Sequence, residues 1–359
     1  MQFRMGAAMN KFFLAWVCAV VLGLFACSGA QAAENVELKT AWMGENEAFP
    51  MWYAVQQGWD RDEGLDVRML RFSSGAEIVQ GLLAYDWLLA GCGAVPAMGA
   101  ILSDRLSIVA VANDESGANA VFVRKESPIF AAQGANPAFP EVRGSAETVR
   151  GKRILCPKNT SAAQMLRGWL KVLGLTEKDV RIDDMPPAKA LGAFAGGLGD
   201  AVVLWSPQTL QAEQKGLVMA ADSRDCGISQ PILLVADKKA AAAGPETLEK
   251  ALGIYFRAVK DLLALGAEGA LPHYREFLKT WAGVALTEEE ALRDLNAHKI
   301  FDLRENLRLM AGAAGESQLQ KWLEEVAAFN AGEARAEDAA RIAEAVDARY
   351  LEALGTQGK

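Results

Sequence analysis

The chain has 359 residues, with 37 Lys and Arg against 45 Asp and Glu, and its formal net charge is −8. This length provides material for one large domain or two, each with a sizeable core. The acidic balance disfavours a nucleic-acid partner.

Residues 1–32 are predicted to be a secretory signal rather than part of the fold. A basic start precedes the apolar run Phe12 to Phe25, and the small-x-small sequence Ala30-Gln31-Ala32 follows. Cleavage after Ala32 would release a soluble periplasmic protein. A lipid anchor at Cys27 is the less favoured alternative, because the residue two places before it is bulky for a lipobox. The remaining chain has no comparable apolar run.

The first structural unit expected in the mature chain is a strand, a helix and a second strand over residues 41–67. Pro50 suits a first helical turn, and Met51, Val55 and Trp59 then recur on one helix face. The following stretch, Leu65 to Phe72, reads as a strand, so the two strands are expected to be parallel. The acidic loop between the first strand and the helix then lies at a strand's carboxyl end, where open α/β sheets bind ligands.

Strands and helices continue to alternate after this unit. Helices are expected near residues 74–84 and 94–104, and strands from residues 87, 107 and 119. The stretch Ser127 to Ser145 is rich in proline, glycine and alanine and is interpreted as a surface excursion. A second unit of the same kind begins at Gly151, with further strands near residues 178–187, 197–207 and 216–222. The alternation favours an α/β fold with mainly parallel sheets.

The last third of the chain has a different pattern. A strand from Pro231 is followed, beyond about Glu246, by segments with a 3.6-residue period that are separated by glycines. They predict a helical carboxyl-terminal region of short helices rather than a coiled coil.

Several of these segments resemble periplasmic substrate-binding proteins of the nitrate, sulfonate and taurine ABC importers. The residues that carry the resemblance are the strand VELKTAWMG, the block FPMWYAVQQGWDRDEGLDV, and the later stretches GSAETVRGKRILCPKNTSA, GLTEKDV and GLGDAVVLWSP. The resemblance implies the type II two-lobed periplasmic-binding-protein fold. Lobe 1 would comprise residues 33–116 and 233–359, and lobe 2 residues 117–232.

The resemblance also implies a function. The protein would be a monomer without a cofactor that captures a small organic solute, such as a sulfonate, an aminosulfonate or an amino-acid-like compound, and delivers it to an ABC permease. Closure would occur by a hinge near Glu115 to Ala120 and Gln230 to Leu233. No catalytic residue and no metal ligand is assigned.

Carrying the family's cleft onto this chain gives positional candidates for ligand binding. They follow predicted strands or precede predicted helices, and they are Glu45, Asn46, Glu47, Ser73, Ser74, Cys92, Gly93, Asn113, Asp114, Asn159, Thr160, Ser161 and Trp205.

The hydroxyls at two predicted helix starts, Ser73-Ser74 and Asn159-Thr160-Ser161, suggest an oxyanion site, because unpaired N–H groups and the positive dipole end lie there. The alternative is that each simply caps its own helix. Glu45 and Glu47 point the other way, since two carboxylates would repel a bare anion and attract an ammonium group. Trp205, at a strand end, could cover an apolar or cationic ligand face.

Two other classes of function stay open. One is an enzyme of the thiamine-pyrimidine synthase type, whose histidine and cysteine-rich segment cannot be located here, and the other is a ligand-sensing partner of a membrane receptor. Only His273 and His298 are present, both in the helical region, where a lone histidine is usually a surface or packed residue. Cys92, Cys156 and Cys226 allow one disulfide at most.

Overall fold

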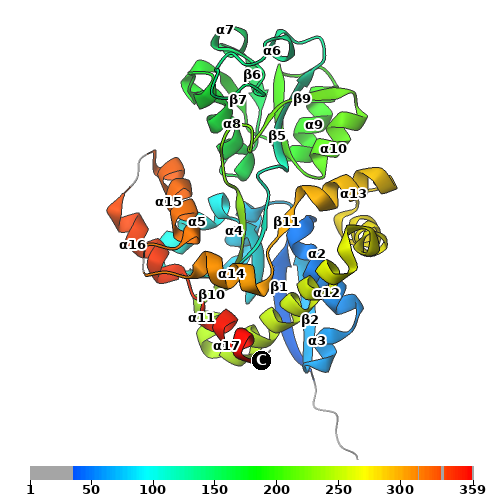
Figure 1. Ribbon diagram of the computed structural model, residues 1–359, viewed down its shortest axis with the longest axis vertical. Helices are drawn as coiled ribbons and strands as arrows, with labels where there is room; N and C mark the ends of the chain where they lie inside the picture. The colour runs from blue at the N-terminus through cyan, green and yellow to red at the C-terminus, as the bar shows by residue number, and fades with distance from the viewer. Residues whose placement is uncertain (1–34, 314, 333–334, 358–359) are drawn as a thin grey trace, which may run out of the picture. The chain divides into compact units, whose positions relative to one another are not determined.

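The computed structural model describes residues 35–313, 315–332 and 335–357. The predicted signal peptide and Cys27 lie outside these residues. Two sheets organise the described chain (Figure 1). The first has the order β11-β4-β10-β3-β1-β2. Its strands are β1 (Val36–Trp42), β2 (Leu65–Arg71), β3 (Leu89–Gly93), β4 (Leu106–Asp114), β10 (Pro231–Asp237) and β11 (Lys299–Ile300).

The second sheet has five strands in the order β7-β6-β8-β5-β9. They are β5 (Asn119–Arg124), β6 (Arg153–Leu155), β7 (Arg181–Asp183), β8 (Ala201–Trp205) and β9 (Leu217–Asp222). The chain therefore leaves the first sheet after β4 and returns to it at β10. The predicted lobe boundaries at residues 116 and 232 are not tested by these strands and stay predictions.

Both sheets are mixed, and the prediction of mainly parallel sheets was wrong in this respect. Strand β1 pairs with β3 in parallel, but β10 is antiparallel to both β3 and β4. In the second sheet β6 is parallel to β7 and β8, whereas β5 is antiparallel to β8 and β9. The antiparallel strands β5 and β10 are the ones by which the chain enters a sheet from the other one, so neither follows a helical crossover from its neighbour.

Helices cover both sheets close to their predicted positions. Those of the first sheet begin with the short 3₁₀ turn η1 (Asn46–Ala48) and α2 (Phe49–Gln56). The predicted helix around Met51 and Trp59 is divided, because Gly58 adopts φ 75° and a new short helix, α3 (Trp59–Asp62), begins there. Two further helices, α4 (Gly75–Tyr85) and α5 (Ala94–Leu102), complete this group.

The second sheet is flanked by α8 (Ser161–Val172), α9 (Pro187–Ala195) and α10 (Gln208–Gln214), and α9 packs on β8 (Figure 1). The predicted surface excursion contains only the short helix α6 (Pro128–Ala131) and an isolated bridge between Gln133 and Arg143. The remaining short elements here are α7 (Ala146–Val149) and the 3₁₀ turn η2 (Glu177–Asp179).

The carboxyl-terminal region is helical, as predicted. It consists of α11 (Lys238–Ala243), α12 (Pro245–Phe277), the π-helical turn η3 (Leu278–Ala282), α13 (Glu288–Ala297), α14 (Leu303–Met310), α15 (Gln318–Ala331), α16 (Ala336–Ala345) and α17 (Arg349–Gln357). Helix α12 is kinked at Gly266, whose φ is 68°. Of the helices in the described ranges, none has the length and apolar character needed to cross a membrane.

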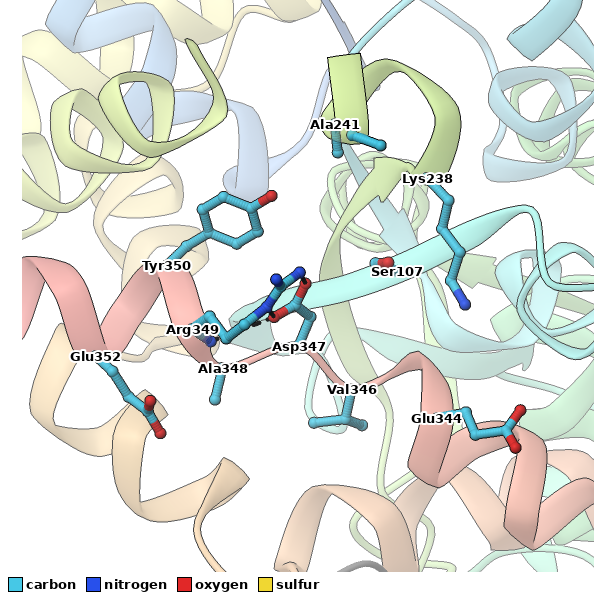
Figure 2. Close-up of a pocket in the computed structure, with 11 residues that line it drawn as sticks. Ser107, Lys238, Ala241, Glu344, Val346, Asp347, Ala348, Arg349, Tyr350 and Glu352 are labelled. Carbon is cyan, nitrogen blue, oxygen red and sulfur yellow. Dashed lines mark hydrogen bonds and ion pairs between the residues drawn. The ribbon is translucent and has the colours of Figure 1, made fainter. Parts of the chain in front are cut away.

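The end of this region returns to the first sheet. Val346 bridges to Ile108 of β4, and Asp347 is paired with Arg349 through both carboxylate oxygens. A cavity of about 530 Å³ opens here, beside Ser107 and Lys238 (Figure 2). Lys238 is in turn paired with Asp104. Lys238, Asp347 and Arg349, three of the charged residues that line this cavity, thus have protein partners.

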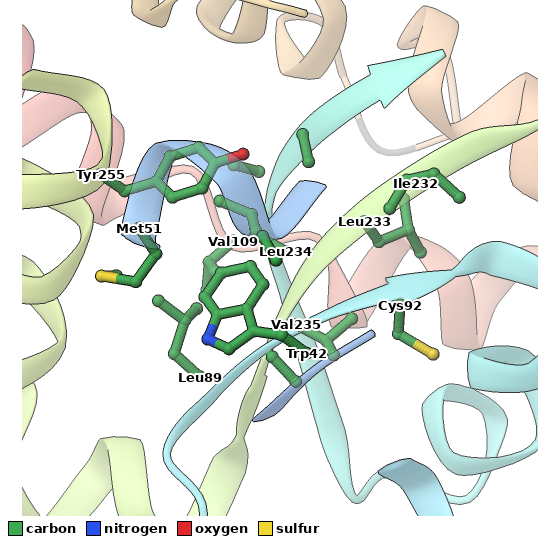
Figure 3. Packing of buried hydrophobic residues seen from close by; sticks show 14 of the residues in the cluster. Trp42, Met51, Leu89, Cys92, Val109, Ile232, Leu233, Leu234, Val235 and Tyr255 are labelled. Carbon is green, nitrogen blue, oxygen red and sulfur yellow. The ribbon is translucent and has the colours of Figure 1, made fainter. Parts of the chain in front are cut away.

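The core of the first sheet is built on the central strand β10 and on aromatic residues from both chain ends (Figure 3). Trp42 of β1 stacks on Tyr255 of α12 with ring centroids 6.0 Å apart, and its indole N–H donates to Thr40. This packing ties residues more than 200 positions apart. The cysteines at 92, 156 and 226 are buried and unbonded to one another, so among the described cysteines the disulfide that the sequence allowed is not formed.

Candidate functional site

The acidic loop after β1 is buried rather than solvated. Glu45, Asn46 and Glu47 have exposed fractions of 8%, 1% and 1%. The loop continues directly into α2, whose first residues are in the core, so the chain carries these polar side chains inward. Tyr255 donates its hydroxyl hydrogen bond to the Glu47 carbonyl at 3.2 Å, and the Met43 N–H donates to Glu47 Oε1 at 3.3 Å.

A glycine makes room for the Glu47 side chain. A Cβ atom on Gly91 of β3 would lie 2.6 Å from Glu47 Cγ and 2.8 Å from the Trp42 ring, distances that real side chains do not adopt. Gly91 is therefore required for the close approach of Glu47 to the sheet.

A third carboxylate comes from the end of β4. Glu115 is 2% exposed, and Asn113, two residues before it, is 1% exposed. Asp114 lies between them and points elsewhere, since it accepts the N–H and hydroxyl hydrogen bonds of Ser116. Asn119 donates from Nδ2 to the Glu115 carbonyl oxygen at 3.4 Å.

Helix α13 and the residue that follows it add an acid and an imidazole. Asp294 and His298, spaced i and i+4, are 3% and 5% exposed. His298 lies between two carboxylates, with Nε2 3.6 Å from Asp294 Oδ1 and Nδ1 3.7 Å from Glu115 Oε1. Its Nδ1 is also 3.4 Å from Asn113 Nδ2. Tyr274 donates to Asp294 Oδ2 at 2.6 Å.

The second sheet meets this group at the end of β8. Trp205 donates its indole N–H to Glu45 Oε1, and Ser206 donates its hydroxyl to Asp294 Oδ1. Both donors are buried. Two side chains that follow the second sheet's strand β8 thus bind carboxylates that pack with the first sheet. These two hydrogen bonds join the sheets at the buried carboxylates.

Glu45, Glu47 and Glu115 form a compact cluster, called here the carboxylate cluster. One oxygen of each lies within 4.8 Å of the others. Burial, together with the neighbouring Glu115, raises the pKa of Glu47 to about 8. Burial also raises the pKa of Glu45 and of Glu115, each reinforced by nearby carboxylates. Each group would release its proton readily only beside a positive charge.

The imidazole and the acid next to the cluster are shifted toward their charged forms. Burial alone would lower the pKa of His298, but hydrogen bonding and attraction to Asp294 raise it overall. Burial alone would raise the pKa of Asp294, but hydrogen bonds from His298, Ser206 and Tyr274 lower it. Asp294 and His298 therefore form a buried ion pair beside the cluster.

Several buried atoms of this region have no hydrogen-bond partner. They include both amide atoms of Asn46, Glu47 Oε2, Glu115 Oε1 and Asn113 Oδ1. His298 Nδ1 is near Glu115 Oε1, but 3.7 Å is an ion-pair separation and too long for a hydrogen bond. Unpartnered buried polar atoms are rare in folded proteins and call for an explanation. Three carboxylate oxygens at this spacing could hold a hard divalent cation or accept hydrogen bonds from an ammonium group.

The predicted helix-start residues form their hydrogen bonds away from this cluster. Ser74 caps α4 by accepting the Glu77 N–H, and Ser73 donates to the Glu77 carboxylate. Thr160 caps α8 by accepting the Ala163 N–H, and its hydroxyl donates to the Pro157 carbonyl. Each of these hydroxyls is engaged locally.

The other candidates form contacts of their own. Asn159 is exposed and lines a cavity of about 310 Å³ together with Lys158 and Arg167, and the Ser161 carbonyl accepts from Gln230 Nε2. The Cys92 thiol lies 3.6 Å from the Gly75 carbonyl, and Gly93 precedes α5. Burial raises the pKa of Cys92, and so do the nearby carboxylates of Glu47 and Glu45.

The structure therefore brings together Glu45, Asn46, Glu47, Asn113 and Trp205 of the predicted set. Sequence reasoning missed Glu115, Asp294, His298, Tyr274 and Ser206 as members of the same group, and Glu115 appeared only as a hinge residue. His298, expected to be an ordinary surface or packed histidine, is buried between two carboxylates. The acid and histidine at i and i+4 on one predicted helix were the available signal.

A family model described as the NMT1-like family matches residues 31–268. The chain belongs to the NMT1-like family. One curated relative of this NMT1-like protein carries the name "Putative ABC transporter periplasmic binding protein" and comes from Brachyspira hyodysenteriae. It is 26% identical over 214 residues, which are 59% of this chain and 62% of the relative. Another, "Putative aliphatic sulfonates-binding protein" of Bacillus subtilis, is 25% identical over 68% of this chain and 72% of its own length.

Solved structures support the fold of this NMT1-like chain. The alkanesulfonate-binding protein SsuA from Xanthomonas axonopodis pv. citri, bound to MOPS, has a TM-score of 0.65 at 19% identity and covers 88% of this chain and 99% of its own. The periplasmic nitrate-binding protein NrtA from Synechocystis PCC 6803 also has a TM-score of 0.65, at 17% identity, covering 90% and 89%. The predicted periplasmic-binding-protein fold and family resemblance are confirmed, and these relatives are binding proteins of ABC transporters rather than enzymes.

Proposed function

We propose that this protein is the periplasmic solute-binding component of an ABC importer. It captures a small organic solute between its two lobes and delivers it to the permease. The names of the relatives support the transport role and the periplasmic location. The export signal at residues 1–32 supports the same location, and the protein acts as a monomer.

The observation that carries this proposal is the joint between the two sheets. Trp205 and Ser206, at the end of β8, donate hydrogen bonds to Glu45 and Asp294 on the other side. Glu45 belongs to the carboxylate cluster, in which Glu47 Oε2 and Glu115 Oε1 have no hydrogen-bond partner. A solute held there would be contacted by both lobes, which is the requirement for ligand-driven closure.

The two segments that cross between the sheets support a hinge. The Glu115 N–H donates to the Gln230 carbonyl at 3.0 Å, and the Gln230 N–H donates to Ser116 Oγ at 3.1 Å. The crossings therefore run side by side and could bend together. Opening at residues 115–120 and 230–233 would release Trp205 and Ser206 from their acceptors and expose the solute site.

The proposed solute is an amine-bearing sulfonate or an amino-acid-like compound. This choice combines the names of the relatives with the buried acidic loop at residues 45–47. The relatives include sulfonate-binding proteins. Buried carboxylates at 45 and 47 favour an added amine over a simple sulfonate or nitrate.

A thermal-shift screen combined with small-angle scattering tests the proposal. A true solute at about one hundred times its dissociation constant should stabilise the protein by about 2.7 kcal/mol. The same compound should reduce the radius of gyration if it closes the lobes. The screen should contain sulfonates, aminosulfonates, amino acids and amines, with pyrimidines to test the enzyme alternative. Failure of all these solutes to change either quantity would count against solute capture.

A further inference from the structure

The charges around the carboxylate cluster do not balance within the protein. Glu45, Glu47, Glu115 and Asp294 are four buried carboxyl groups, and His298 is the basic side chain paired with them. Within the described part of the chain, no Lys or Arg forms an ion pair with any of the four. Isolated buried carboxylates are very costly, so the site requires either protons or a cation from outside.

The unpartnered atoms next to the cluster specify what kind of cation. Glu47 Oε2, Glu115 Oε1, Asn113 Oδ1, Asn119 Oδ1 and Gln230 Oε1 are all hydrogen-bond acceptors. Each of these side chains is at most 2% exposed. The amides adjoin Glu115, because Asn119 donates to its carbonyl and Gln230 accepts from its N–H. Asn46 contributes one unpartnered donor, Nδ2, but the other unpartnered atoms next to the cluster are acceptors, and they lie on several chain segments.

We infer that the solute is a donor-rich organic cation, with an ammonium, amidinium or guanidinium group held by Glu45, Glu47 and Glu115. This inference rests on the proposed solute-capture function and names the ligand class of that site. Charge-assisted N–H···O bonds of about 2.8 Å from a tetrahedral ammonium place their acceptors about 4.6 Å apart. The cluster oxygens, within 4.8 Å of one another, match that spacing.

Two other occupants fit less well. A sulfonate or nitrate would add negative charge beside four carboxyl groups and would supply no donor to the orphaned acceptors. A bare divalent ion could bind the three carboxylates, but it satisfies only oxygens within direct reach. An organic ligand with several N–H groups can serve both the carboxylates and the amide oxygens of Asn113, Asn119 and Gln230.

The experiment is a calorimetric and thermal-shift comparison of wild type with Glu47→Gln and Glu115→Gln. The probes are 1,4-diaminobutane and agmatine as cations, taurine as a zwitterion, ethanesulfonate as an anion, and MgCl₂ and CaCl₂. Glu325→Gln, on the exposed face of α15, is the matched control. We expect a cationic probe to stabilise wild type and the control, and each cluster variant to bind it at least tenfold more weakly.

The unliganded variants provide a readout that a merely structural role would not give. Folding must bring each of these buried carboxyl groups a proton that the unfolded chain lacks near pH 8, and Glu47→Gln and Glu115→Gln remove that cost. Their melting temperatures at pH 8 without probe should therefore rise while the probe-induced shift is lost. If a variant fails to fold, as judged by circular dichroism, Glu45→Gln replaces it, since an amide oxygen can still accept the Trp205 hydrogen bond.

The outcomes separate this inference from the proposed function. Binding of ethanesulfonate that is equal in wild type and variants would overturn the cation assignment and leave solute capture standing. Carboxylate-dependent binding of Mg²⁺ or Ca²⁺ without any response to the cationic probes would also overturn it. A protein that no cationic probe stabilises contradicts the inference, and lobe closure with another solute would still support capture.

Discussion

Two groups of polar residues in this protein stand at similar places in the sequence, at the ends of strands or the starts of helices, but they differ in their hydrogen bonding. The hydroxyls that begin α4 and α8 accept N–H groups of their own helices, so their hydrogen bonds are completed within three residues. The carboxylates after β1 and β4 are carried into the interior and have oxygen atoms without a hydrogen-bond partner. Polar groups that lack a local partner mark a binding site better than polar groups that merely stand at a strand or helix end.

The strongest test of this contrast concerns the network that supports the carboxylate cluster. Asp294→Ala removes the acceptor of Ser206 and Tyr274 and leaves His298 without its ion-pair partner. We expect a loss of about 3–5 kcal/mol in the free energy of unfolding, measured by urea denaturation, because a buried charge is left uncompensated. Glu325→Ala, an exposed carboxylate deletion, should stay within about 0.5 kcal/mol. Equal losses would show that the network has no special role.

The pH dependence of stability tests the cluster itself. The pKa of Glu47 is raised to about 8 in the folded protein, so the folded state holds a proton that the unfolded chain releases near its ordinary pKa of 4.5. The stability of the ligand-free protein should therefore be highest below about pH 4.5 for this group and fall by about 4 kcal/mol as the pH rises to 8. The raised pKa of His298 acts in the same direction, since stability is lost as the pH rises through it.

Glu47→Gln should flatten this profile, because the amide does not titrate. Other groups face the cluster: Glu45, Glu115 and Asp294 are ionisable, and Tyr255 and Tyr274 have pKa values raised by burial well above neutrality. Residual slope in the variant would measure Glu45, Glu115 and Asp294 together with His298. An unchanged slope would mean that Glu47 does not hold its proton in the folded state. Denaturation curves at closely spaced pH values are the measurement.

Two tryptophan variants distinguish a role in lobe closure from a role in packing alone. Trp205→Phe removes the N–H donor to Glu45, and Trp169→Phe removes a donor to the Arg143 carbonyl within the second sheet's side. Each should lower stability by about 1.5 kcal/mol through a lost buried hydrogen bond. Only Trp205→Phe should also weaken solute binding in calorimetry. Of the two hydrogen bonds removed, the one from Trp205 to Glu45 crosses between the sheets, and the one from Trp169 to Arg143 does not. Equal affinity in both variants would argue against a closure role for Trp205.

Local patterns predicted much of the fold and part of the site. The alternation of short strands and helices identified both units, and the strand ends identified Glu45, Glu47 and Trp205. The mixed sheets were not predictable this way, because the direction of β5 and β10 depends on which sheet the chain comes from. The convergence of Glu115 with His298, 183 positions later, depends on how α13 packs, and no local spacing encodes it.

The smallest expected effects lie at the helix starts. Ser74→Ala and Thr160→Ala each remove one N-cap bond and should lower the free energy of unfolding by about 1 kcal/mol in urea denaturation. Solute affinity should not change, because both hydroxyls are already engaged within their own helices. A tenfold loss of affinity in either variant, beyond its loss of stability, would show that opening of the lobes frees these hydroxyls for the ligand. It would then restore the oxyanion site that the sequence suggested and make a zwitterionic solute the better match to both groups.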